Sequence, residues 1–113
     1  MADPSRGDLW LVDLDPIRGH EQGGNRPALV VSVDPLNHGP AGLVILLPLT
    51  TRPKGVPSHV AVRPPEGGLR QVSYIKCEDV RSVSKDRLSS RWGAVSATTL
   101  SAVEERLRLL MGL

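Results

Sequence analysis

The stretch GHEQGGNRPALVVS (residues 19–32) joins a polar segment, residues 19–26, to the apolar run Ala28–Val31. The apolar run predicts a strand over residues 27–33, with Pro27 at its first position, where a sheet least needs an N–H donor. A loop that only connected two strands would need a turn signal and few other polar groups. The stretch therefore predicts a core strand preceded by a loop with a candidate function.

Further strands are predicted on both sides of this stretch. The chain has 10 prolines and 11 glycines, which divide it into short apolar pieces, as is typical of a β-rich domain with tight connections. In the first piece Trp10 and Val12 fall on one face and Leu9 on the other, so both faces are expected to be covered. Pro48 marks the expected end of the most hydrophobic piece. The predicted strands cover residues 8–14, 27–33, 42–49, 58–63, 71–75 and 80–83.

The last part of the chain has a helical period. Four apolar residues recur there at spacings of 3, 4 and 3. They are Leu100, Val103, Leu107 and Leu110. This spacing predicts one apolar face of a helix, with Ser96 as its N-cap and Gly112 as its stop. The predicted fold class is mainly β with α, a small bent sheet or partly closed barrel with a C-terminal amphipathic helix, in a single domain over residues 1–113.

Composition excludes several classes of protein. The 113 residues carry a formal net charge of +2, well short of the dense basic surface of a dedicated nucleic-acid-binding protein, so a polyanion site would need local clustering. Aromatic residues make up 3%, which disfavours a platform that stacks several bases. The single cysteine excludes an intramolecular disulfide and indicates a reducing cytoplasm. Neither a secretory signal nor a membrane span is expected.

Three polar segments are candidates for function, and each also has a plain structural interpretation. The amides of Gly23 and Gly24 and the guanidinium of Arg26 could bind an anion, or their loop could be an ordinary connection. Hydroxyls and cations in residues 50–55 could orient a phosphodiester, or form a solvated turn. Residues 77–83 could place Val side chains in the core and charges in solvent. From the residues alone these alternatives stay open.

Metal and thiol chemistry are both disfavoured. The three histidines do not have metal-ligand spacing. They are His20, His38 and His59. Cys77 is followed by two carboxylates, which would raise the pKa of its thiol and disfavour the reactive thiolate. Cys77 is therefore expected to be a small buried residue, and no metal or other cofactor is expected.

Taken together, four ordered segments resemble the MazF/PemK family of toxin endoribonucleases. The most specific is Gly19–Pro27, which resembles the family's G-x-E-Q-x-G-x-R-P loop. The others are residues 6–16 (RGDLWLVDLDP), 48–57 (PLTTRPKGVP) and 77–83 (CEDVRSV). The resemblance covers roughly residues 5–113, and the predicted C-terminal helix falls in its expected place.

The resemblance implies an SH3-like β-barrel with a C-terminal helix, assembled as a homodimer. Family members cleave single-stranded RNA such as mRNA at short sequence motifs without metal, and a small acidic MazE-like antitoxin neutralises them. Arg26 and Thr50 match the positions that carry catalysis, and Glu21 matches a supporting acidic position. Because a guanidinium stays protonated near neutral pH, Arg26 is expected to stabilise the transition state rather than to act as a base.

The general base stays open between Glu21 and His20, which stands where the family often has serine. His20 could instead contact RNA or be a tolerated substitution. The remaining predicted RNA contacts come from the same loop, from the segment after Thr50, and from residues 77–83. The predicted RNA-binding residues are His20, Gln22, Gly23, Gly24, Asn25, Thr51, Arg52, Lys54 and Arg81.

Two other functions fit the same scaffold. A CcdB-like toxin would poison DNA gyrase by protein contact through the end of its C-terminal helix, residues 109–113, and would need no phosphate-binding loop. An inactive relative would only bind its antitoxin. The presence of Glu21, Arg26 and Thr50 favours the enzyme over both.

Overall fold

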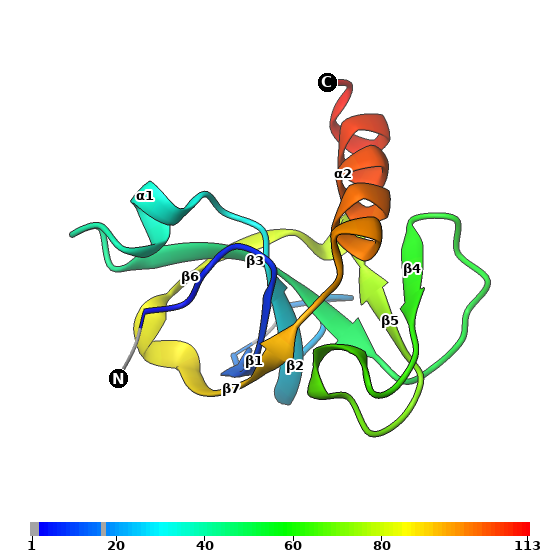
Figure 1. The fold of residues 1–113 in the computed structure, drawn as a ribbon, viewed down its shortest axis with the longest axis horizontal. Coiled ribbons are helices and arrows are strands. Elements are labelled where there is room, and N and C mark those ends of the chain that lie inside the picture. Colours follow the sequence, from blue (N-terminus) through cyan, green and yellow to red (C-terminus); the bar gives the residue numbers. More distant parts are fainter. Residues whose placement is uncertain (1–2, 17) are drawn as a thin grey trace.

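The structure is a computed structural model that describes residues 3–16 and 18–113 (Figure 1). Its strands are β1 (Asp8–Asp13), β2 (Asn25–Val30), β3 (Leu43–Thr50), β4 (His59–Val62), β5 (Ser73–Lys76), β6 (Arg81–Ser84) and β7 (Leu88–Ala94). Its helices are α1 (Asp34–Asn37) and α2 (Ala97–Met111), and three short 3-10 turns are η1 (Glu66–Gly68), η2 (Cys77–Asp79) and η3 (Lys85–Arg87).

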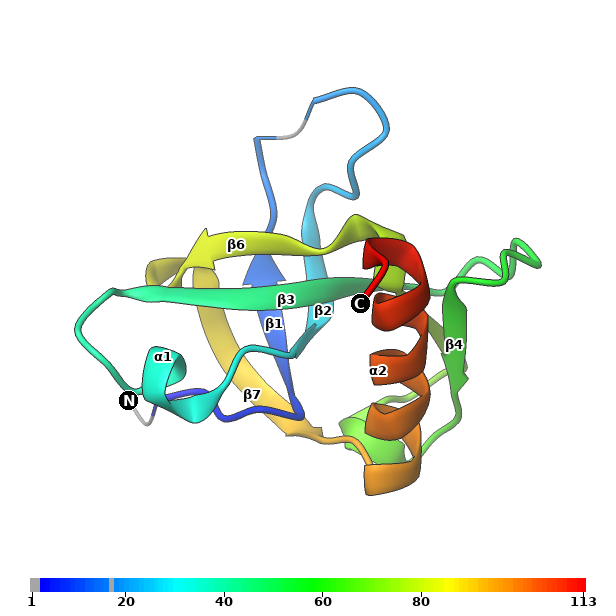
Figure 2. The same ribbon diagram turned by 90° about the horizontal axis from the view of Figure 1, so that it is seen from above.

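The strands form one antiparallel, strongly bent sheet in the order β4-β5-β3-β2-β1-β7, and β6 also pairs with β3. The predicted class, a small β-rich fold with a C-terminal helix, is confirmed. In the described part of the chain β4 and β7 do not pair with each other, so the sheet is open rather than a closed barrel. Figure 2 shows the described residues between β1 and β2, 14–16 and 18–24, extending beyond the sheet.

Strand β7 was not predicted, because its sequence has no apolar alternation. Only Leu88 of this strand is buried, and most of the remaining residues are exposed. The strand forms because its backbone pairs with β1, from Asp8 opposite Ala94 to Val12 opposite Leu88, with two irregularities in register. Backbone pairing at a sheet edge leaves little signal in the side chains.

Two prolines lie deeper in their strands than expected. Pro27 is the third residue of β2, which begins at Asn25, and it lies before Ala28, where pairing with β3 starts. Pro48 does not end β3. On one edge of β3, pairing with β6 stops at Leu46 and pairing with β5 starts at Leu49. Pro48 lies in the unpaired gap between these two ladders. A missing N–H donor costs least at such positions.

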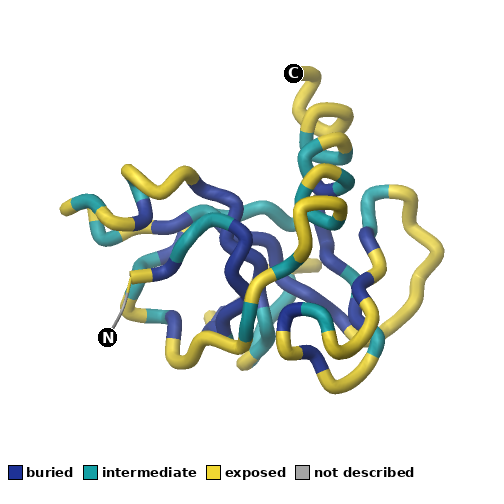
Figure 3. The backbone as a smooth tube through the Cα atoms, viewed as in Figure 1, coloured by how far each residue is buried: buried dark blue, intermediate teal, exposed yellow. Residues whose placement is uncertain are grey.

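The sheet has a hydrophobic cluster on each face, as the first strand predicted. Leu9 of β1 belongs to one cluster, with Leu29, Leu47 and Val103. The second cluster lies on the opposite face of β1 to β3 and contains Trp10, Val12, Leu14, Ala28, Val30, Val44, Leu46, Val83 and Leu88. Figure 3 shows these central strands as the buried part of the chain. The two clusters fix the strands, and therefore the loops at their ends.

Helix α2 has the predicted caps. Ser96 accepts a hydrogen bond from the amide of Thr99 (3.1 Å), and Gly112 ends the helix in the left-handed conformation. Val103 is buried against the sheet, and Leu100 and Leu107 pack beside it. Leu110 is 48% exposed, so the apolar face predicted for the helix continues past the part that the sheet covers. None of the helices in the described residues has the length and apolar character that a membrane crossing requires.

Replacing Glu66 with alanine is expected to destabilise the fold by about 1–2 kcal/mol at neutral pH, because hydrogen bonds to a charged group are lost. The Glu66 carboxylate accepts from the amide of Ser96 (2.9 Å) and the hydroxyl of Thr99 (2.6 Å) at the start of α2. Partial burial raises the pKa of Glu66, but these bonds outweigh it and hold the pKa below the ordinary 4.5.

The sign of the pH effect follows from this lowered pKa. Glu66 contributes its full stability above its unfolded-state pKa, and the contribution is lost as the pH falls through the lower folded-state pKa. Urea unfolding of wild type and Glu66→Ala should therefore show a difference at pH 7 that shrinks below about pH 4.5. If the free energies of unfolding of wild type and Glu66→Ala differed by the same amount at pH 7 and well below pH 4.5, this account would be contradicted.

Candidate functional site

Arg26 and Thr50 lie on two neighbouring strands, Arg26 near the start of β2 and Thr50 at the end of β3. The ladder between β2 and β3 pairs Val30 with Leu46 and Ala28 with Pro48. Arg26 lies two residues before this ladder on β2, and Thr50 lies two residues beyond it on β3. In an antiparallel pair the start of one strand lies beside the end of the other. The two residues that were predicted to carry catalysis therefore stand at the same end of the β2–β3 pair.

The guanidinium of Arg26 has amide partners rather than an acidic one. Its Nε donates to the carbonyl of Gly23 (3.2 Å). The side-chain oxygen of Gln22, placed toward it, accepts from Nε at 2.7 Å and from Nη2 at 3.1 Å. Among the ion pairs of the described residues, none involves Arg26. A half-buried guanidinium that no carboxylate in these ion pairs neutralises is suited to bind an anion.

Lys76, at the end of β5, places a second cation on the other side of Gln22. Lys76 is buried, with 7% of its surface exposed. Its Nζ lies 3.3 Å from the side-chain amide of Gln22 and 3.8 Å from the carboxylate of Asp79, its ion-pair partner. The side-chain amide of Gln22 has a single oxygen, which can face either Lys76 or Arg26 but not both. The positive charge around Gln22 is therefore only partly compensated, as an anion-binding site requires.

The polar loop is held in place by two aspartates. The amide of Gln22 donates to Asp79 in η2 (3.0 Å), and the amide of Gly24 donates to Asp15 (3.0 Å). Gly24 has a φ of 76°, a left-handed conformation that glycine adopts without strain. The Gly24 amide was predicted to approach a phosphate. In the structure it already has a partner within its own loop.

A cavity of about 490 Å³ gathers residues from four segments of the chain. The predicted residues His20, Glu21 and Lys54 line it. The other lining residues are Val56, His59, Lys76, Glu78 and Asp79. Glu21 accepts a hydrogen bond from the amide of Arg18 (2.6 Å), which folds its side chain back on its own loop. The cavity therefore carries both cations and carboxylates.

The remaining predicted RNA contacts are distributed around this end of the sheet. Thr51, Arg52 and Lys54 are exposed in the loop between β3 and β4. The amide of Arg52 donates to the hydroxyl of the buried Thr50 (3.2 Å), which orients that side chain. Asn25 is exposed at the start of β2. Arg81 begins β6, and its guanidinium lies 3.5 Å from the carbonyl of Leu14, after β1.

Three residues of the site were not predicted. Lys76 is a charged residue at the end of a short strand of mixed polarity, and in a sequence such a lysine is equally typical of a solvated position. Asp79 and Glu78 were expected to face solvent, but Asp79 binds Lys76 and the loop. The apolar half of that prediction is confirmed, since Val83 is buried and Val80 packs against the core. In the described residues, no group of three or more His, Cys, Asp or Glu side chains has a metal-binding arrangement.

Cys77 is expected to resist thiol reagents in the folded protein. Burial, and then the nearby carboxylate of Glu78, raise the pKa of its thiol to about 11. At pH 8 the thiolate is therefore scarce as well as inaccessible. Labelling with a chromogenic disulfide should be slow in buffer and complete in guanidinium chloride. Rapid stoichiometric labelling of the native protein would contradict the expected burial.

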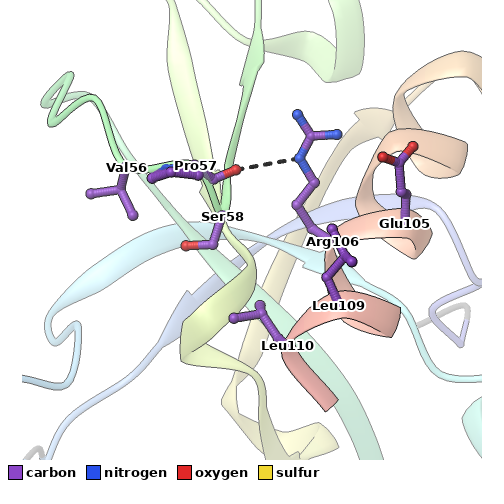
Figure 4. Close-up of a pocket in the computed structure, with 7 residues that line it drawn as sticks. All are labelled: Val56, Pro57, Ser58, Glu105, Arg106, Leu109 and Leu110. Carbon is purple, nitrogen blue, oxygen red and sulfur yellow. Dashed lines mark hydrogen bonds between the residues drawn. The ribbon is translucent and has the colours of Figure 1, made fainter. Parts of the chain in front are cut away.

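A second, apolar cavity of about 550 Å³ lies between the end of α2 and the loop before β4 (Figure 4). Arg106 Nε donates to the carbonyl of Pro57 (3.4 Å) across this cavity. Apolar residues remain exposed on both sides of this cavity: Val56 in the loop, and Leu109, Leu110, Met111 and Leu113 at the end of the chain. An exposed apolar surface of this kind is typical of a protein interface.

A small antiparallel sheet with two partly compensated cations at one end is typical of the class of proteins that bind an anionic ligand. Comparison with known proteins identifies the family within this class. A family profile described as PemK-like, MazF-like toxin of type II toxin-antitoxin system matches residues 5–111. The chain therefore belongs to the PemK/MazF family of toxins.

Individual relatives agree with this assignment over nearly the whole chain. Endoribonuclease MazF9 of Mycobacterium tuberculosis is 36% identical over 113 residues, which cover 96% of each protein. The crystal structure of MazF from Deinococcus radiodurans has a TM-score of 0.89 at 32% identity and covers 100% of both chains. The MazE–MazF structure from the same organism has a TM-score of 0.82 at 32% identity, covering 100% of this chain and 99% of the other.

Proposed function

We infer that the chain is an endoribonuclease toxin that cleaves RNA and is neutralised by a cognate antitoxin. The family match supports this proposal, as do the relative named an endoribonuclease and the structural relative solved with MazE. The observation that carries it in this chain is Arg26, which takes part in none of the ion pairs of the described residues and stands at the same end of the β2–β3 pair as Thr50. The proposal takes residues 1–113 as one toxin domain acting in the cytoplasm on single-stranded mRNA.

The chemistry proposed is attack by the ribose 2′-hydroxyl on the adjacent phosphorus. The new bond joins the 2′-oxygen to phosphorus, and the bond to the 5′-oxygen breaks. The 2′-hydroxyl gives up its proton and the leaving 5′-oxygen gains one, so the products are a 2′,3′-cyclic phosphate and a 5′-hydroxyl. The nucleophile comes from the RNA, so the step needs no metal-bound water. The protein must stabilise charge and transfer protons.

The site supports a division of these tasks. Arg26 can donate two parallel hydrogen bonds to the non-bridging oxygens as negative charge develops there. The hydroxyl of Thr50, oriented by the amide of Arg52, can donate to the same phosphate and hold it in line. Glu21 and His20 both line the cavity and both remain candidates for the base. The side chain of Glu21 is held in position by the hydrogen bond that it accepts from the amide of Arg18.

Cations around the cavity supply contacts that position the strand. Arg52 and Lys54 extend from the loop between β3 and β4, and Arg81 lies at the start of β6. Phosphate contacts set the register of a strand without reading its sequence. Gln22, Gly23, Asn25 and Thr51 offer further polar contacts beside Arg26 and Thr50. Sequence preference is proposed to come from the cavity, whose lining includes Lys54, rather than from Arg52 and Arg81.

Incubation of purified protein with a long single-stranded RNA, with and without EDTA, tests the proposal. Discrete fragments that persist in EDTA, and that are strongly reduced with Arg26→Ala and Thr50→Ala, are expected. A parallel assay of DNA gyrase supercoiling tests the other toxin mechanism, which the endoribonuclease relatives do not favour. Intact RNA together with inhibited gyrase would overturn the proposal. Intact RNA with an antitoxin that still binds would indicate an inactive relative.

We also propose that the chain assembles as a homodimer through the apolar end of α2. Its support is the surface formed by Leu109, Leu110, Met111 and Leu113, which one copy leaves exposed. Light scattering should give twice the mass of one chain, and Leu110→Asp should shift the protein toward the monomer. A wild-type monomer at micromolar concentration would contradict this part of the proposal.

A further inference from the structure

A carboxylate on the wall of the 490 Å³ cavity is held by two neighbouring side chains. Ser58 donates to one oxygen of Glu78 (2.7 Å), and Nε2 of His59 lies 2.8 Å from the other. His59 begins β4 and pairs with Lys76 of β5, which η2 follows directly. The pairing of β4 with β5 therefore positions the donors for Glu78.

His59 contributes one specific bond. Its side chain is 4% exposed, and its Nδ1 is buried without a hydrogen-bond partner among the described residues. A carboxylate only accepts, so the ring nitrogen facing Glu78 carries the hydrogen. A buried polar atom without a partner costs free energy, so a role in the core alone would favour an apolar residue here. The bond to Glu78 explains why the position carries an imidazole.

Glu78 and Glu21 are both exposed carboxylates at this cavity, and Glu78 is the one that two neighbouring side chains hold in place. Burial raises its pKa, but the bonds from His59 and Ser58 outweigh burial and hold the pKa below its ordinary value, so the group is ionised at neutral pH. Asp79 instead binds Lys76 and the amide of Gln22. The side chain of Glu78 is 38% exposed. Each of its oxygens has one donor and can accept another, so it presents two adjacent acceptors to the cavity.

An anionic group in an RNA site repels phosphate, so its favourable contacts are with hydrogen-bond donors on bases. Guanine presents two adjacent donors, N1–H and N2–H, beside its O6 acceptor. Adenine, cytosine and uracil each place an acceptor next to their donor, which would face a carboxylate oxygen. Lys54 lines the same cavity and can donate to O6. The pair of acceptors and the ammonium together match the edge of guanine.

We propose that Glu78, positioned by Ser58 and His59, is a specificity-determining residue that reads a guanine of the RNA substrate. The proposal rests on the proposed ribonuclease function and adds the base that the cavity selects. His59 is a positioning residue, because it acts on the base only through Glu78. The cleavage motif of the wild-type enzyme is therefore expected to contain a guanine at one fixed position.

Sequencing of fragment ends, followed by kinetics on short RNAs, tests the proposal. Replacing the motif guanine with inosine, which lacks N2–H, should lower kcat/KM of the wild type by roughly 5- to 150-fold. Glu78→Gln should lose this discrimination while it still cleaves RNA. His59→Leu should lose it too, and His59→Gln, which can place an N–H near the position of Nε2, should restore part of it. Asp86→Asn, at an exposed carboxylate in η3, is the control and should discriminate like the wild type.

Three results would overturn the proposal. One is a wild-type motif without a fixed guanine. Another is Glu78→Gln slowing the guanine and inosine substrates equally with their ratio preserved, which would assign Glu78 to the chemistry or the fold. In both cases RNA is still cleaved and the proposed function stands. Absence of any cleavage by the wild type would overturn that function and this inference with it.

Discussion

Arg26→Ala is expected to lower the rate of RNA cleavage by about 10²–10³-fold, the usual cost of losing one preorganised donor to a developing negative charge. Arg26 stands at the same end of the β2–β3 pair as Thr50, and the partners of its side chain among the described residues are Gly23 and Gln22. Its charge is therefore available to the phosphate. Because the side chain is only half-buried, the melting temperature should change little. Single-turnover kinetics on a short RNA, together with thermal melting, measure both quantities.

Two variants sharpen this prediction. Arg26→Lys keeps the charge but loses the planar pair of donors, so it should recover only part of the rate. Arg63→Ala removes an exposed arginine that follows β4 and should cleave like the wild type. Equal losses for Arg26→Ala and Arg63→Ala would mean that the protein uses its total positive charge rather than a positioned guanidinium.

Gly68→Ala is expected to destabilise the fold by about 3 kcal/mol, since it combines a strained backbone with overpacking. Gly68 has a φ of 75°, and a Cβ added there would lie 2.2 Å from the carbonyl oxygen of Trp92. Neither backbone can move freely, because η1 lies directly against β7 at this point. The approach is close from the other side as well, because a Cβ added at Gly93 of β7 would lie 2.7 Å from the backbone of Gly67. The melting temperature should fall by roughly 10 °C.

Gly42→Ala is the matched control for this substitution. Gly42 has a φ of 70°, but an added Cβ would have nothing within 4 Å, so only the backbone strain is introduced. It should cost about 1–2 kcal/mol. Urea denaturation of the two variants separates the strain from the steric clash. Equal losses of stability would show that the contact between η1 and β7 yields to the added methyl group.

Elements that depend on neighbouring residues in the sequence were predicted correctly. The spacing of Leu100, Val103 and Leu107, and the caps Ser96 and Gly112, predicted α2 because a helix is encoded by neighbouring residues. Strand β7 was missed because partners far along the chain determine it, and its exposed residues carry no alternation. The openness of the sheet has the same origin, since it depends on whether two edge strands meet.

The candidate site was predictable in part. Arg26 and Thr50 each flank a strongly apolar run, and the antiparallel pairing of β2 with β3 places both at the same end of the pair. The engagement of the Gly24 amide with Asp15 and the cation pair around Gln22 depend on side-chain orientations that residue types do not reveal. Lys76 and Glu78 resemble solvated charges in the sequence, and only the pairing of β4 with β5 sets them in the cavity.

The chemistry of the fragment ends tests the central claim most directly. Mass spectrometry of short fragments from a single-stranded RNA identifies both new termini without knowledge of the cleavage motif. Attack by the 2′-hydroxyl predicts a 5′-hydroxyl on one fragment and a 2′,3′-cyclic phosphate, or the 3′-phosphate formed by its hydrolysis, on the other. Fragments with a 5′-phosphate and a 3′-hydroxyl, or RNA that stays intact, would contradict it.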